Sequence, residues 1–147
     1  MKSFLVWSSP APERTIAVAM RRCFSTKTIE EIETELESKG KEYWEYLLTK
    51  ALQDKSLDVL EHFTLSMLVD EVDEQGIGAL VRNFPYMRVA GLSGNSWLIS
   101  MNARTLVELW REPGSKAFAE SVITELDRRQ VCPMFIRLAF GERTDAR

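Results

Sequence analysis

An alternating stretch, Phe63-Thr64-Leu65-Ser66-Met67-Leu68-Val69, sets the expectation for the whole fold. Every odd-numbered residue in it is large and apolar, while two of the three even-numbered residues carry a hydroxyl group. Side chains of an extended strand point alternately to opposite faces, so this pattern predicts a strand with one well-buried face.

Two further strands are expected at Tyr86–Leu92 and Ser96–Met101. They flank Ser93-Gly94-Asn95, a sequence typical of a hairpin turn. A short apolar strand, Phe4–Trp7, is expected near the start of the chain. The strands therefore predict an antiparallel sheet.

Apolar residues at helical spacing lie on both sides of these strands. Thr28 and Glu31 have the spacing of a capping box at the start of a helix that Gly40 ends. Asn102 is a typical N-cap for a helix that ends before Pro113. Further helices are expected over 13–23, 43–52, 77–84 and 118–126, with a short helical segment at 57–62. The predicted class is α+β, an antiparallel sheet flanked by helices, in a single domain over residues 1–147.

The composition is that of a soluble globular protein. The 147 residues are 45% hydrophobic and 28% charged, with a net charge of -3. This charge provides no basic surface for nucleic acid or for a membrane. Cys23, Cys132 and the single histidine, His62, are too scattered for a zinc motif. We expect a reduced, cytoplasmic protein that binds no metal.

General motifs identify no active site. Gly76-Ile77-Gly78 is a fragment of a dinucleotide loop, but it lies inside a helical pattern rather than after a strand. The acidic residues of 70–74 could hold a hard cation, although a solvated helix start is favoured because no glycine bends the segment. For His62 we favour a capping or core-edge hydrogen bond over catalysis.

Four segments, taken in order, carry a family resemblance: Arg14–Ser25, Leu60–Leu65, Trp97–Leu106 and Cys132-Pro133. They resemble the first helix, the LEH segment with its FTF-like strand, the strand with the N-x-R-S-L helix start, and a late motif of the flavin-dependent thymidylate synthase family. The resemblance implies a homotetramer that methylates dUMP to dTMP. Its carbon donor is methylenetetrahydrofolate, and FAD reduced by NADPH carries the hydride, at sites built by several subunits.

The family signature, R-H-R-x-x-S-x-N-x-x-S-x-R-Y, is largely absent. Arg82 occupies the first arginine position, but Asn83 replaces the histidine and Phe84 the second arginine. The long segment that follows the signature in the family is missing as well. Because an anionic substrate needs several cationic or amide donors, dUMP methylation is expected to be lost or strongly impaired.

The resemblance also implies which residues would bind ligands. Arg82, Asn102 and Arg104 match positions that hold FAD, and Arg111 is the candidate for the arginine that binds the pyrimidine. Arg111 lies nine residues after Asn102, where the family arginine lies eleven after, so the match requires a local irregularity. Glu108 lies one turn from Arg104 and could pair with it, which would oppose flavin binding. No catalytic residue is assigned.

These observations leave three hypotheses. The chain is an enzyme that still uses flavin chemistry, with a partner supplying missing groups, or it is a non-catalytic oligomeric module for nucleotide binding or assembly. An unrelated α+β domain would make the ordered resemblance coincidental. We favour retention of the fold with weak FAD binding, and a homo-oligomer, most simply a tetramer.

Overall fold

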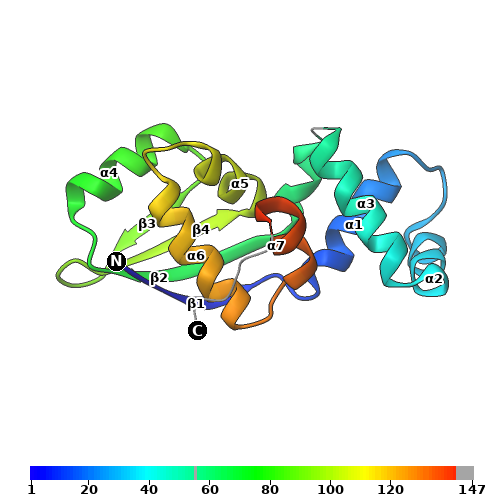
Figure 1. Cartoon of the computed structure of the whole chain (residues 1–147), viewed down its shortest axis with the longest axis horizontal. Helices are drawn as coiled ribbons and strands as arrows, with labels where there is room; N and C mark the ends of the chain where they lie inside the picture. Colours follow the sequence, from blue (N-terminus) through cyan, green and yellow to red (C-terminus); the bar gives the residue numbers. More distant parts are fainter. Residues whose placement is uncertain (55, 142–147) are drawn as a thin grey trace.

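A four-stranded antiparallel sheet forms one half of the molecule in the computed structural model, which describes residues 1–54 and 56–141 (Figure 1). Its strand order is β1-β2-β4-β3, and all three neighbouring pairs are antiparallel. The strands are β1 (Lys2–Ser8), β2 (Thr64–Asp70), β3 (Arg88–Gly91) and β4 (Trp97–Asn102). The predicted strands and the α+β class are therefore confirmed.

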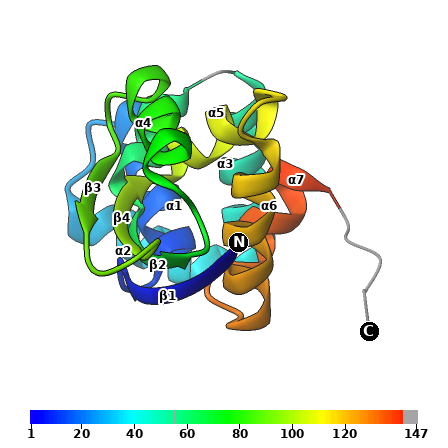
Figure 2. The same cartoon turned by 90° about the vertical axis from the view of Figure 1, so that its left-hand side faces the viewer.

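One face of the sheet is buried. Leu65, Met67 and Val69 are fully buried, as the alternation predicts, and Ile99 lies beside them on β4. Helices α5 (Ala103–Arg111) and α6 (Lys116–Arg128) cover this face, with α5 against β4 and α6 against β1 (Figure 2). The apolar side chains of the strands thus build the core together with the two helices.

The opposite face of the sheet carries an apolar row that crosses all four strands. Phe4, Leu68, Leu98 and Ala90 are register partners from β1 through β2 and β4 to β3. The Phe4 side chain is 41% exposed, whereas Leu68 and Leu98 are half-buried. This open sheet face contrasts with the covered one because its apolar groups meet solvent.

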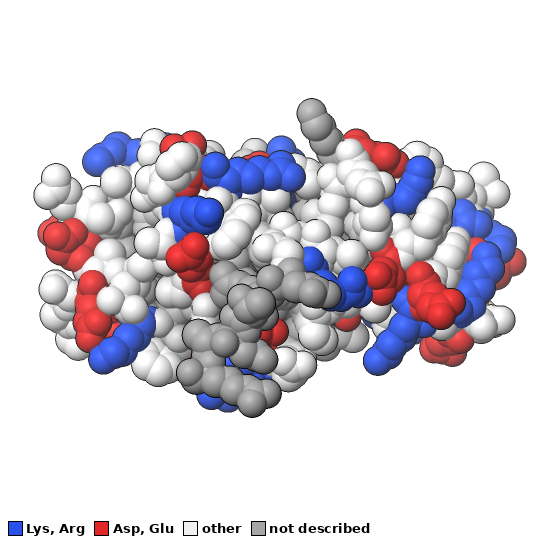
Figure 3. Space-filling view, in the orientation of Figure 1, with Lys and Arg blue, Asp and Glu red and all other residues white. Residues whose placement is uncertain are grey.

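Three helices form a lobe beyond one end of the sheet, α1 (Pro12–Cys23), α2 (Ile29–Lys39) and α3 (Lys41–Gln53) (Figure 1). The start of α2 is a complete capping box: the Glu31 N–H donates to Thr28 Oγ1 at 3.3 Å, and the Thr28 N–H donates to Glu31 Oε2 at 2.7 Å. Side chains of both charges are interspersed over this lobe (Figure 3).

The sheet and the lobe share one core. The short 3-10 helix η1 (Leu57–His62) leads into β2, and α7 (Pro133–Phe140) packs against α3 and α6. The rings of Phe63 and Phe135 meet edge-to-face at 6.0 Å between these elements. Large side chains from both halves therefore hold them together.

The helix before the hairpin and the hairpin itself differ slightly from prediction. Helix α4 (Glu74–Asn83) ends one residue before Phe84, and β3 begins at Arg88 rather than Tyr86. The reason is a turn, closed by the Met87 N–H, which donates to the Phe84 carbonyl at 3.1 Å. Asp73 caps α4 through the Gly76 N–H at 2.7 Å, so the second half of the acidic stretch is a helix start, whereas Asp70 ends β2 and Glu71 pairs with Lys2.

None of the helices within the described residues is both long and apolar enough to cross a membrane.

Cys23 is exposed at the end of α1 and Cys132 is buried before α7, and neither forms a disulfide. Burial raises the pKa of the Cys132 thiol, which therefore stays protonated at neutral pH.

Candidate functional site

The N-terminus of α5 uses Asn102 as its cap. Asn102 Oδ1 accepts hydrogen bonds from the Thr105 N–H at 2.9 Å and from Thr105 Oγ1 at 3.0 Å. The predicted cap is confirmed. This side-chain oxygen thus satisfies a helix-end donor rather than remaining free for a ligand.

Arg104, in the first turn of α5, is held between two carboxylates. Its Nε donates to Glu108 Oε1 at 3.1 Å, and its Nη1 donates to Glu61 Oε1 at 2.8 Å. These hydrogen bonds, that to Glu108 first and that to Glu61 second, raise the pKa of Arg104. The predicted Arg104–Glu108 pair is present, and Glu61 adds a second negative charge.

An open cleft of about 700 Å³ adjoins this pair. It is lined by Arg82, Asn83 and Phe84 from the end of α4, and by Glu108, Arg111 and Glu112 from the end of α5. We call this hollow the arginine cleft. Among the described residues, Arg82 and Arg111 take part in no ion pair, and both side chains are exposed.

The helix geometry explains which predicted ligand residues meet. Arg104, Glu108 and Arg111 are spaced four and three apart, so they share one face of α5. Arg82 lies in the last turn of α4, which ends opposite that face. Arg82 and Arg111 therefore line one cleft, Arg104 adjoins it through Glu108, and Asn102 is not among its lining residues.

His62 differs from expectation. Its side chain is exposed at the end of η1, where a capping or core-edge hydrogen bond was predicted. Its backbone carbonyl, rather than its imidazole, accepts a hydrogen bond from Ser9 Oγ at 3.5 Å. The described residues also contain no group of three or more acidic, histidine or cysteine side chains that could hold a metal.

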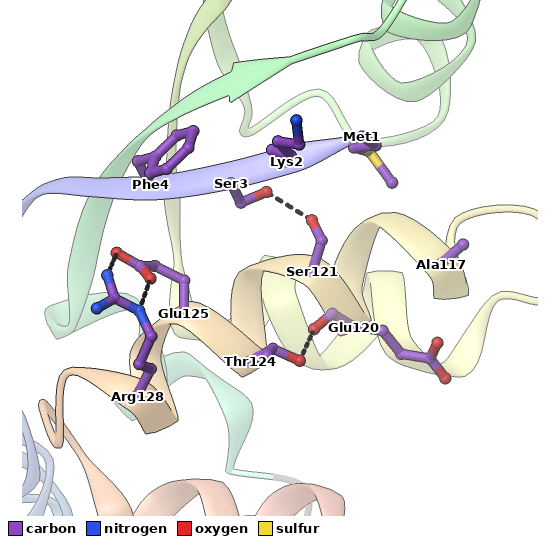
Figure 4. Close-up of a pocket in the computed structure, with 10 residues that line it drawn as sticks. All are labelled: Met1, Lys2, Ser3, Phe4, Ala117, Glu120, Ser121, Thr124, Glu125 and Arg128. Carbon is purple, nitrogen blue, oxygen red and sulfur yellow. Dashed lines mark hydrogen bonds and ion pairs between the residues drawn. The ribbon is translucent and has the colours of Figure 1, made fainter. Parts of the chain in front are cut away.

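A second hollow, of about 810 Å³, lies between β1 and α6 (Figure 4). Its polar groups bond to one another: the hydroxyls of Ser3 and Ser121 are paired, and Glu125 accepts from the Leu5 N–H at 3.1 Å. Arg128 donates to the same carboxylate at 2.7 Å. These contacts from α6 cover the edge strand β1 and leave the polar groups of the hollow already paired, so it is a poorer ligand site than the arginine cleft.

Burial raises the pKa of Glu125, but hydrogen bonds from Arg128, the Leu5 N–H and Arg129 outweigh that effect and lower it overall. The carboxylate is therefore ionised and fully partnered at neutral pH.

The sequence comparisons and the structural comparison differ in what they find. No protein-family model matches this sequence, and no curated protein matches it either. The structure, however, superposes on the crystal structure of the flavin-dependent thymidylate synthase ThyX from Helicobacter pylori, complexed with FAD and dUMP. The TM-score is 0.66 over 89% of this chain and 97% of that one, at 10% sequence identity.

The chain has the fold of a flavin-dependent thymidylate synthase. At 10% identity the likeness concerns the fold and leaves the roles of single residues open. It supports the family resemblance at the level of architecture, which the four sequence segments predicted.

Sequence reasoning missed Glu61, Glu112 and the position of Phe84. Glu61 belongs to the LEH-like segment beside His62, yet nothing local in the sequence indicates that η1 brings it to Arg104, 43 residues away. Phe84 is 8% exposed and belongs to the core as well as to the cleft wall.

Proposed function

We propose that this protein is a divergent relative of the flavin-dependent thymidylate synthases that no longer methylates dUMP and binds FAD weakly. The observation that supports this most is that Arg104 is already paired with the carboxylates of Glu61 and Glu108. An arginine that a flavin pyrophosphate would need is already bonded within the chain, and the surplus carboxylate repels further anions.

The residues in place do not suit FAD or dUMP. Glu108 brings a carboxylate to the wall of the arginine cleft, and Phe84 supplies a largely buried ring where the family has a cation. Asn102 uses its side-chain oxygen for the helix cap. We therefore derive no step of a flavin reaction from these side chains.

An activity assay tests the proposed loss. The purified protein is incubated with dUMP, methylenetetrahydrofolate, NADPH and FAD, and dTMP is measured over time. We expect no steady formation of dTMP, because removal of even one preorganised polar group commonly costs about a hundredfold to a thousandfold in rate. Steady turnover would overturn the proposal.

We propose further that the protein is a cytoplasmic homo-oligomer, with a tetramer as the simplest form. The open sheet face supports this, because Phe4, Leu68 and Leu98 form an apolar row that is partly exposed to solvent. Sheet faces of this kind normally pack against another layer. A second copy of the chain would supply that layer.

Light scattering tests the assembly. We expect a mass of about four chains for the unchanged protein, and dissociation on Phe4→Lys/Leu98→Lys, which places two charges in the apolar row. Tyr46→Lys is the matched control, since Tyr46 is 55% exposed on α3, outside the sheet. A monomer of 16.9 kDa at micromolar concentration would contradict the proposal.

The alternative is a non-catalytic oligomeric module that binds a nucleotide or organises an assembly. Arg82 and Arg111 favour a ligand of some kind, because both guanidinium groups are unpaired in the described structure and line the same cleft. Yellow protein after purification would indicate retained flavin, and colourless protein agrees with this alternative.

A further inference from the structure

An apolar hollow of about 370 Å³ lies beside the arginine cleft, between α4 and the start of α6. Its walls include the apolar side chains of Val72, Ala79, Leu80, Phe84, Ala117 and Phe118. The Ser115 hydroxyl, one of its few polar groups, already donates to the Leu109 carbonyl at 2.8 Å. The hollow therefore suits an apolar occupant better than a polar one.

The apolar hollow and the arginine cleft share a wall. Asn83, Phe84 and Glu112 line both of them, so a single molecule could lie across Phe84 with one end in each. Arg82 and Arg111 belong to the cleft side alone. An apolar cavity thus opens beside two guanidinium groups that have no ion-pair partner among residues 1–54 and 56–141.

The guanidinium groups of Arg82 and Arg111 are available to bind an anion in the cleft. Arg104 pairs with Glu108 at 3.1 Å and with Glu61 at 2.8 Å, so these three side chains carry one surplus negative charge, although Glu61 does not line the cleft. Glu108 and Glu112 therefore balance the charges of Arg82 and Arg111 in the cleft lining, but neither arginine is tied up in an ion pair within the described residues. Two guanidinium groups on neighbouring helices suit a carboxylate or phosphate, which accepts bidentate hydrogen bonds.

The geometry points to a small amphipathic anion as the ligand, with a carboxylate or phosphate head between Arg82 and Arg111 and an apolar body beneath α4. The volume of about 370 Å³ holds about a dozen groups of the size of a water molecule or methylene. The inference uses the cleft of the proposed function, but it depends on neither flavin nor dUMP binding.

Titration calorimetry with decanoate tests the inference, with decanol as the uncharged analogue and inorganic phosphate as the head alone. We expect saturable binding of decanoate that is stronger than that of decanol or phosphate. Arg82→Gln/Arg111→Gln weakens decanoate about tenfold or more and leaves decanol unchanged, because charge-assisted bonds contribute to the head only. Ala79→Phe/Ala117→Phe fills the hollow and weakens both.

Arg22→Gln, at an exposed arginine of α1 in the lobe, is the matched control and leaves decanoate affinity unchanged. Absence of saturable decanoate binding overturns the inference, as does equal affinity in the unchanged protein and in Arg82→Gln/Arg111→Gln. Since no flavin or nucleotide is present, a failure here is distinct from dTMP formation, which tests the proposed function separately.

Discussion

Two charged regions differ in how their charges are paired. One surrounds Glu35 in the three-helix lobe, and the other contains Arg82 and Arg111 in the arginine cleft. The Glu35 carboxylate is 10% exposed. It forms ion pairs with Arg21 at 3.2 Å, Lys27 at 2.6 Å and Lys39 at 2.9 Å. The two cleft arginines are exposed and have no such partner within the described chain. Charges that hold the fold are satisfied internally, whereas those of the cleft are available to a ligand.

Arg104 belongs with the charges that are paired within the chain, although the family resemblance assigns its position to ligand binding. Both of its carboxylate partners come from the chain itself, one on η1 and one on α5. Arg104, which the family resemblance assigns to FAD, is thus paired within the chain in the same way as the charges around Glu35. Arg82 and Arg111, by contrast, line the arginine cleft without an ion-pair partner among the described residues.

The largest effect is expected at Glu125, a carboxylate of the internally satisfied kind. Glu125→Ala removes the acceptor for the Leu5 N–H and for Arg128 and Arg129, which should cost about 2 kcal/mol in the free energy of unfolding. Arg82→Gln/Arg111→Gln should stay within about 0.5 kcal/mol, because solvated side chains contribute little. Equal losses in denaturant unfolding would break the distinction between the two kinds of region.

A smaller, pH-dependent effect is expected at Glu35. Hydrogen bonds from Lys27, Lys39 and Arg21 lower the pKa of Glu35, so its contribution is complete above the unfolded-state value of about 4.3 and is lost as the pH falls below it. The melting temperature of Glu35→Gln should therefore lie below that of the unchanged protein at pH 7. The two values should converge on acidification, and a difference that grows would contradict the assignment.

Local patterns made much of the fold predictable. The alternation at 63–69, the capping box of Thr28 and the cap of Asn102 each depend on residues close in sequence, and each is present. The Arg104–Glu108 pair follows from helical spacing. Glu61 and the cleft do not, because they depend on how η1 and the end of α4 approach α5.

Arg14, like Arg104, lies between two carboxylates of the chain. Arg14 contacts Glu33 at 3.0 Å and Glu37 at 3.5 Å in the lobe. Glu33→Gln/Glu37→Gln therefore changes the same charges as Glu61→Gln/Glu108→Gln, but away from the cleft. It is the matched control for a change in overall charge.

Titration of FAD against the unchanged protein and the two double variants, followed by quenching of flavin fluorescence, tests most directly whether the ion pairs of Arg104 with Glu61 and Glu108 prevent this arginine from binding FAD. We expect weak binding by the unchanged protein and an increase of about fivefold to tenfold in Glu61→Gln/Glu108→Gln, since each exposed pair accounts for up to about 1 kcal/mol. Glu33→Gln/Glu37→Gln should leave the affinity unchanged. Tight FAD binding by the unchanged protein, or equal affinity in all three forms, would contradict the claim that these ion pairs keep Arg104 from binding FAD.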